Sequence, residues 1–222
     1  MNIPSKKLTI LVSSSGYGIE ELLDRIYVLL TAYGYEVWMS HKGTLPVFSN
    51  RSAFGNCLAA VEKCDIFFGL ITPHYGSGKD DSDSLSITHR ELLRAIELKK
   101  PRWLLAHDHV VFARALLGNL SYAGSGRRVK AKLAVRKNPI IDDLRVIEMY
   151  DAATLSGSLK PVGEREGNWV QKYVSPEDAM LFATEQFYRY QEVEEFVKEN
   201  FANEAAVRAS LEQAHGRQGV KP

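Results

Sequence analysis

Strand-like and helix-like segments that alternate along the first half of the chain constrain its fold more than any other feature. Short apolar or β-branched stretches at 8–12, 35–39, 66–71 and 102–106 are typical of buried strands. Between them, residues 19–33, 54–61 and 88–99 carry apolar side chains at helical spacing. This alternation predicts an α/β fold whose central, mostly parallel sheet is covered by helices on both faces, with 66–71 as a central strand.

In such a sheet, ligands bind beyond the carboxyl ends of the strands. Ser13, Ser14, Ser15 and Gly16 follow the first strand and precede a helix, where free amides and the helix dipole favour an anion such as a pyrophosphate. An ordinary polar turn is the alternative, since the chain has no glycine-rich dinucleotide motif and no Walker-type lysine loop.

A second candidate binding segment follows the central strand. There Gly76 permits close backbone approach, and Tyr75, beside His74, offers a ring that can stack on a base or on nicotinamide. A simple turn is the alternative for this segment.

The composition indicates in which cellular compartment the protein is expected and which kinds of partner are not expected. Lys and Arg number 28 against 27 Asp and Glu, so no overall charge favours nucleic acid. Cys57 and Cys64 lie too far apart on one predicted helix to form a disulfide, which favours a reducing compartment, and the cytoplasm is expected. The N-terminus lacks the apolar core of a signal peptide, and no apolar run reaches the roughly 20 residues that span a bilayer.

The chain divides into three predicted parts. Residues 1–120 form the α/β domain, 121–138 a basic loop, and 139–222 a C-terminal extension that packs on the same domain. The extension is predicted to hold a strand within 140–149 and helices within 176–212. The basic segment 124–138 is interpreted as a solvated loop, with phosphate binding as the alternative.

Five motifs in a fixed order carry a resemblance to a known family. Residues 12–14, 64–69, 74–76, 86–95 and 99–101 together resemble an uncharacterised bacterial domain family that is related to TIR domains and, more distantly, to nucleoside deoxyribosyltransferases. The resemblance covers about 7–109. It implies a flavodoxin-like three-layer sandwich and cleavage of an N-glycosidic bond, most simply in NAD, which would be a substrate and not a cofactor.

The resemblance also singles out Glu91, because the enzymatic relatives place a catalytic carboxylate on the corresponding helix. One carboxylate near the ribose can stabilise an oxocarbenium-like centre. His89 stands where the family often has a second acid, which argues against a mechanism with two carboxylates. The alternative is structural: Thr88 and Glu91 have the spacing of a capping box, in which the glutamate bonds back to its own helix.

Other reactive residue types have structural interpretations. His107, Asp108 and His109 are of the kinds that bind zinc or iron, but no further ligand stands at a recognisable spacing, so no metal is predicted and Asp108 is assigned to cap the next helix. The two cysteines are interpreted as packing residues. Asp65, at the amino end of its strand, is interpreted as structural.

The sequence therefore predicts a TIR-like, NAD-consuming hydrolase or cyclase, with a role in anti-phage signalling. Its expected partners are NAD or a related nucleotide and either further copies of itself or an effector protein, with neither membrane nor nucleic acid. A non-catalytic nucleotide-sensing or interaction module and a deoxyribosyltransferase are the alternatives. The catalytic candidate is Glu91, and the candidate binding residues are Ser13, Ser14, Ser15, Gly16, Tyr17, His41, His74, Tyr75, Gly76 and Ser86.

Overall fold

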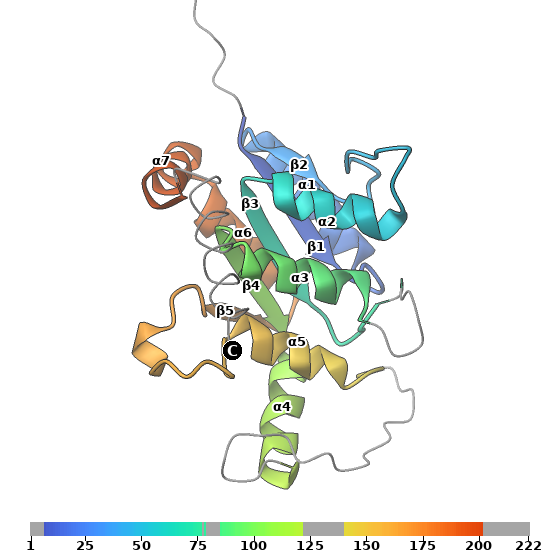
Figure 1. Ribbon diagram of the computed structural model, residues 1–222, viewed down its shortest axis with the longest axis vertical. Helices are drawn as coiled ribbons and strands as arrows, with labels where there is room; N and C mark the ends of the chain where they lie inside the picture. The colour runs from blue at the N-terminus through green and yellow to red at the C-terminus, as the bar shows by residue number, and fades with distance from the viewer. Residues whose placement is uncertain (1–6, 77, 79–84, 122–139, 202–222) are drawn as a thin grey trace, which may run out of the picture.

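A five-stranded parallel sheet forms the centre of the protein (Figure 1). The computed structural model describes residues 7–76, 78, 85–121 and 140–201. The strands are β1 (Thr9–Ser14), β2 (Glu36–Trp38), β3 (Ile66–Ile71), β4 (Arg102–His107) and β5 (Val170–Tyr173), in the order β2-β1-β3-β4-β5. The predicted α/β fold is confirmed, and β3 is the middle strand.

Helices cover both faces of the sheet. They are α1 (Glu20–Ala32), α2 (Ala53–Lys63), α3 (Ile87–Glu97), α4 (Asp108–Ser121), α5 (Arg145–Ala153), α6 (Pro176–Phe187) and α7 (Tyr190–Phe201), with a short 3-10 helix at Val162–Glu164. Helices α2, α3 and α5 lie on one face of the sheet and α1 and α6 on the other (Figure 1). Their apolar side chains form a separate core on each face. The result is a three-layer sandwich with a core on each side of the sheet.

Two glycines explain local features of these elements. Gly34 follows α1 with a φ of +100°, which favours glycine, and it turns the chain back into β2 as the sequence predicts. Gly69 lies in the middle of β3, where a Cβ atom would meet the Leu104 side chain at 2.8 Å and the Phe67 ring at 2.9 Å. A larger residue there would force neighbouring strands or side chains to move.

The C-terminal part corrects one prediction. The strand expected within 140–149 is wrong, because this stretch leads into α5, whose Val146, Ile147 and Met149 are buried at helical spacing. The strand of the extension is β5, which pairs with β4 and so extends the same sheet. The predicted helices are confirmed by α6 and α7 as far as residue 201, while 202–212 and the basic segment 124–138 lie outside the described residues.

Among the residues that the structure describes, no helix has both the length and the apolar character needed to cross a membrane.

Candidate functional site

The strand order places a topological switch point between β1 and β3. The chain moves from β1 to β2 on one side and returns to β3 on the other, so the loops that follow β1 and β3 diverge at this edge. Here Ser15 Oγ and Thr72 Oγ1 share a hydrogen bond of 2.6 Å. A Cβ atom on Gly76 would lie 3.2 Å from the Ser15 Cβ, so the two loops touch.

Glu91 reaches this edge from α3. Ser13 near the end of β1 donates a hydrogen bond from Oγ to Glu91 Oε2 at 2.5 Å. Both side chains are buried, and Glu91 retains an exposed fraction of 6%. The carboxylate is therefore held between α3 and the sheet, directly beneath the loops of the switch point.

The capping-box interpretation of Glu91 is wrong. Helix α3 begins at Ile87, and its N-cap is Ser86, whose Oγ accepts a hydrogen bond from the His89 amide at 3.3 Å. Glu91 therefore lies in the second turn of α3, too far along to reach the cap. Ser86, predicted to bind ligand, is buried and fixes the start of the helix instead.

Burial changes the protonation of Glu91. Removal from water raises its pKa to about 7, although hydrogen bonds from Ser13 and from the Cys57 thiol oppose this shift. Near neutral pH the carboxyl group therefore exists in both protonation states. Burial and the neighbouring Glu91 carboxylate raise the pKa of the Cys57 thiol to about 12, so this thiol stays protonated.

The prediction that the cysteines serve packing is confirmed. Cys57 and Cys64 are both free, buried and part of the core beneath α2. Asp65 is structural, as predicted, because its Oδ2 accepts a hydrogen bond from the Thr9 amide at the start of β1, at 2.8 Å.

Tyr75 holds the β3–α3 loop in place instead of offering its ring to a ligand. Its side chain is buried, its hydroxyl shares a hydrogen bond of 2.8 Å with His89 Nδ1, and the Arg145 guanidinium lies 4.5 Å from its ring centre. Stacking of Tyr75 on a base is therefore wrong for this conformation.

Burial lowers the pKa of His89 to about 4, so His89 is neutral and does not replace a second acid.

The C-terminal extension contributes Asp142 to the same loop. Asp142 Oδ1 accepts a hydrogen bond from the Tyr75 amide at 2.8 Å, and its Oδ2 lies 3.4 Å from His74 Nδ1. His74 is partly exposed and adjoins Gly18 of the β1–α1 loop. Sequence reasoning missed Asp142, because it lies far along the chain from the residues that it holds.

The remaining candidate binding residues lie in two separate parts of the structure. Ser14, Gly16 and Tyr17 lie in the β1–α1 loop, where no side chain caps the α1 N-terminus at Ile19. His41 follows β2 and lies 3.2 Å from Asp24 of α1, so it contacts a different part of the surface from the two loops.

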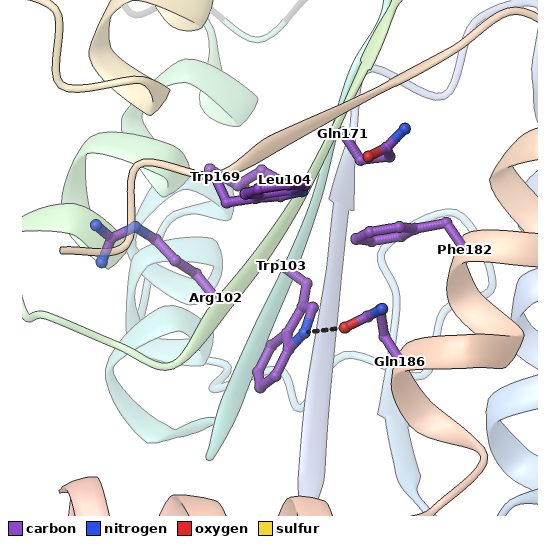
Figure 2. A pocket seen from close by; sticks show the side chains of 7 residues that line it. All are labelled: Arg102, Trp103, Leu104, Trp169, Gln171, Phe182 and Gln186. Carbon is purple, nitrogen blue, oxygen red and sulfur yellow. Dashed lines mark hydrogen bonds between the residues drawn. The ribbon is translucent and has the colours of Figure 1, made fainter. Parts of the chain in front are cut away.

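A cavity of about 400 Å³ lies beside the β4–β5 edge (Figure 2). It is lined by Arg102, Trp103, Leu104, Trp169, Gln171, Phe182 and Gln186. Figure 2 shows the Trp103 indole turned toward Gln186, to which its Nε1 donates a hydrogen bond of 3.2 Å. None of these residues was predicted to form a site, and none of them contacts Glu91 through a hydrogen bond in the described structure.

Comparison with known proteins identifies one family. The family model described as a domain of unknown function (DUF4062) matches residues 9–122, just over half of the chain. The match spans the segment from β1 to α4 and includes Ser13, Thr72 and Glu91. No curated protein and no solved structure matches the chain.

Proposed function

The chain belongs to the family described as a domain of unknown function (DUF4062), and from the site within its family segment we propose that it cleaves the N-glycosidic bond of a nucleotide, with NAD as the substrate. Glu91 is the proposed catalytic residue. The loops after β1 and β3 are the proposed binding elements. The finer proposal, that the family segment is TIR-like, rests on the resemblance of its motifs.

One observation carries the proposal: the Glu91 carboxylate bonds across to Ser13 of β1 and not to its own helix. A carboxylate at the switch point can stabilise the positive charge that develops on a ribose ring as its bond to the base breaks. Nicotinamide leaves NAD as a neutral molecule, so the leaving group needs no acid. A single carboxylate therefore suffices for this reaction.

The surrounding loops suit the rest of such a substrate. The β1–α1 loop ends at an α1 N-terminus that no side chain caps, and amides at such a position favour a pyrophosphate. The partly exposed His74, 3.4 Å from Asp142, borders the same edge. We assign the pyrophosphate of NAD to the β1–α1 loop and its nicotinamide riboside to the side facing Glu91.

The pH dependence of turnover tests this assignment. Because the ionised form of Glu91 stabilises the ribose cation and its pKa is about 7, kcat/KM for NAD should rise about tenfold between pH 6 and pH 8 and then level off. Nicotinamide release, followed by chromatography, measures the rate. A profile that falls with rising pH would contradict a role for the ionised carboxylate.

The burial of Glu91 favours a second candidate function. With 6% exposure and one oxygen bound by Ser13, the carboxylate also fits a module that binds a nucleotide without cleaving it. Calorimetry with NAD and with ADP-ribose, run beside the release assay, separates the two functions. Heat of binding with no nicotinamide release would support the sensing module.

A further inference from the structure

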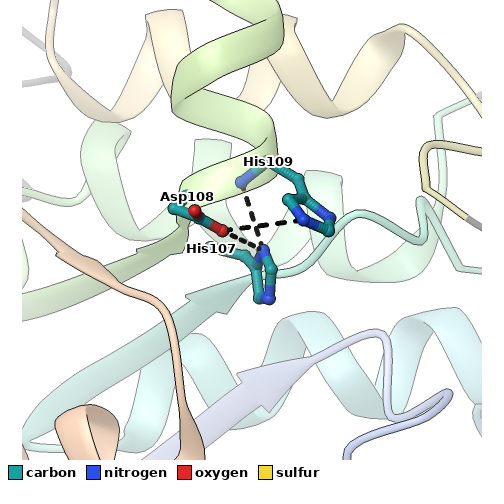
Figure 3. Close-up of side chains that lie close together, drawn as sticks. All are labelled: His107, Asp108 and His109. Carbon is teal, nitrogen blue, oxygen red and sulfur yellow. Dashed lines mark hydrogen bonds and ion pairs between the residues drawn. The ribbon is translucent and has the colours of Figure 1, made fainter.

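Three residues of types that bind metals, His107, Asp108 and His109, gather where β4 meets α4 (Figure 3). Asp108 Oδ1 lies 3.1 Å from His107 Nδ1 and 3.9 Å from His109 Nε2. One ligand atom from each of the three residues lies within 4.8 Å of the others. Figure 3 shows the two imidazoles and the carboxylate turned toward one another.

The hydrogen bonds of this cluster leave one carboxylate oxygen of Asp108 without a donor. The His109 amide donates to His107 Nδ1 at 3.2 Å, so this nitrogen accepts and carries no proton. It therefore has no hydrogen to offer Asp108 Oδ1, and that oxygen is buried without a hydrogen-bond partner. Two acceptor atoms 3.1 Å apart repel each other, and a cation beside them would relieve this repulsion.

Tyr173 of β5 supplies an independent observation. Its side chain is 2% exposed, its ring stands edge-on to His107 with 5.2 Å between the ring centres, and its hydroxyl is also buried without a hydrogen-bond partner. The Asp108 carboxylate adds to burial in raising the pKa of Tyr173, as expected for a negative charge close to the hydroxyl. A buried polar group without a partner is costly, so a missing ligand offers an explanation for both oxygens.

We propose that His107, Asp108 and His109 bind a divalent transition-metal ion, with the Tyr173 hydroxyl as a further oxygen beside it. Two imidazoles and one carboxylate are a ligand set that suits zinc and ferrous iron. Ligand atoms around such ions lie about 3 to 3.5 Å apart, and the 3.1 Å between His107 Nδ1 and Asp108 Oδ1 falls in this range. Metal binding through His107 Nδ1 would replace the hydrogen bond that this nitrogen accepts from the His109 amide. His109 Nε2 is 3.9 Å from Asp108 Oδ1, and the three ligand atoms lie within 4.8 Å of one another, so the exposed His109 ring has to move closer to complete the set.

The fold also explains why the sequence did not predict a metal site at these residues. Spacing in the sequence shows three adjacent residues and no fourth ligand, whereas the fold packs the Tyr173 ring of the C-terminal extension against His107. His107 and Asp108 are partly exposed and His109 is exposed, so water can reach a metal bound by them.

Metal titration of the full-length, tag-free protein tests the proposal. After treatment with a chelator, the protein is titrated with Zn²⁺ in a calorimeter and with Co²⁺ by visible absorption. We expect one ion per chain and a ligand-field spectrum, and at least tenfold weaker binding for Asp108→Asn and His109→Ala. Circular dichroism checks that both variants fold.

The matched control is His41→Ala, which removes another exposed histidine that also lies beside an aspartate, Asp24, and should bind zinc as the wild type does. Tyr173→Phe removes a hydroxyl without a hydrogen bond, so it should fold normally and bind zinc about tenfold more weakly. Absence of binding by the wild type, or equal binding by wild type and Asp108→Asn, would overturn the site. Unchanged affinity of Tyr173→Phe would remove that hydroxyl from it.

Discussion

Replacement of Glu91 by glutamine should remove the pH dependence of stability that this side chain causes, so that the stability of the variant relative to the wild type increases as pH rises. The pKa of Glu91 is about 7 in the folded protein against 4.5 for an ordinary glutamate, so folding favours the protonated form. The stabilisation is fully present below about pH 4.5 and is lost as pH rises through 7. A pKa difference of this size corresponds to about 3 kcal/mol, which the uncharged glutamine does not lose.

Urea unfolding of both proteins at a series of pH values measures this effect. The control is Glu97→Gln, the same change on the same helix at a side chain that is exposed and paired with Arg94 at 2.7 Å. Glu97→Gln should follow the pH dependence of the wild type. If the free energies of unfolding of Glu91→Gln and wild type change in parallel from pH 4 to pH 8, the carboxylate is not buried as described.

Replacement of Phe187 by alanine should lower the free energy of unfolding by about 3 to 5 kcal/mol. The Phe187 ring is 0% exposed and contacts three aromatic rings, with centre-to-centre distances of 5.9 Å to Tyr35, 5.2 Å to Phe68 and 5.3 Å to Trp103. These contacts join α6 of the extension to the middle of the sheet. A loss of this size is a large fraction of the stability of a typical domain.

The control for packing is Phe112→Ala on α4, where the side chain is 67% exposed and little stability should be lost. Thermal and urea unfolding of the two variants beside the wild type give the comparison. Similar small losses in both would show that the C-terminal part stabilises the sheet far less than its contacts indicate. The expected difference would show that the family segment 9–122 depends on residues beyond it.

The sequence predicts four of the five strands and misses β5. Residues 66–71 form an unbroken apolar run, so their burial in β3 follows from composition alone. The β5 residues Val170–Tyr173 include Gln171 and Lys172, which are typical of an edge strand with one solvent side and are hard to distinguish from a loop. The apolar residues of α5 form too short a run to separate a helix from a strand without the helical spacing of Val146, Met149 and Ala153.

Some contacts of the candidate site can be predicted from the sequence, and others depend on tertiary packing. The strand order predicts that Ser13 and Ser15 share an edge with the loop after β3, since parallel strands end on the same side. Which of two cap-competent residues starts α3 is decided by loop geometry, and Ser86 takes the place predicted for Thr88. Because Ser86 and not Thr88 is the N-cap, the Glu91 carboxylate accepts a hydrogen bond from Ser13 instead of bonding back to its own helix. Asp142 and Tyr173 join their clusters only through tertiary packing of the extension.

Nicotinamide release from NAD by the wild type, Glu91→Gln and Glu97→Gln at about pH 8 tests the proposed chemistry most directly. The wild type and Glu97→Gln should release nicotinamide at equal rates, while Glu91→Gln, folded and hydrogen-bonded to Ser13 but unable to ionise, should be at least about a hundredfold slower. Equal rates in all three proteins would remove Glu91 from catalysis. Absence of release by the wild type would contradict NAD cleavage by the protein itself.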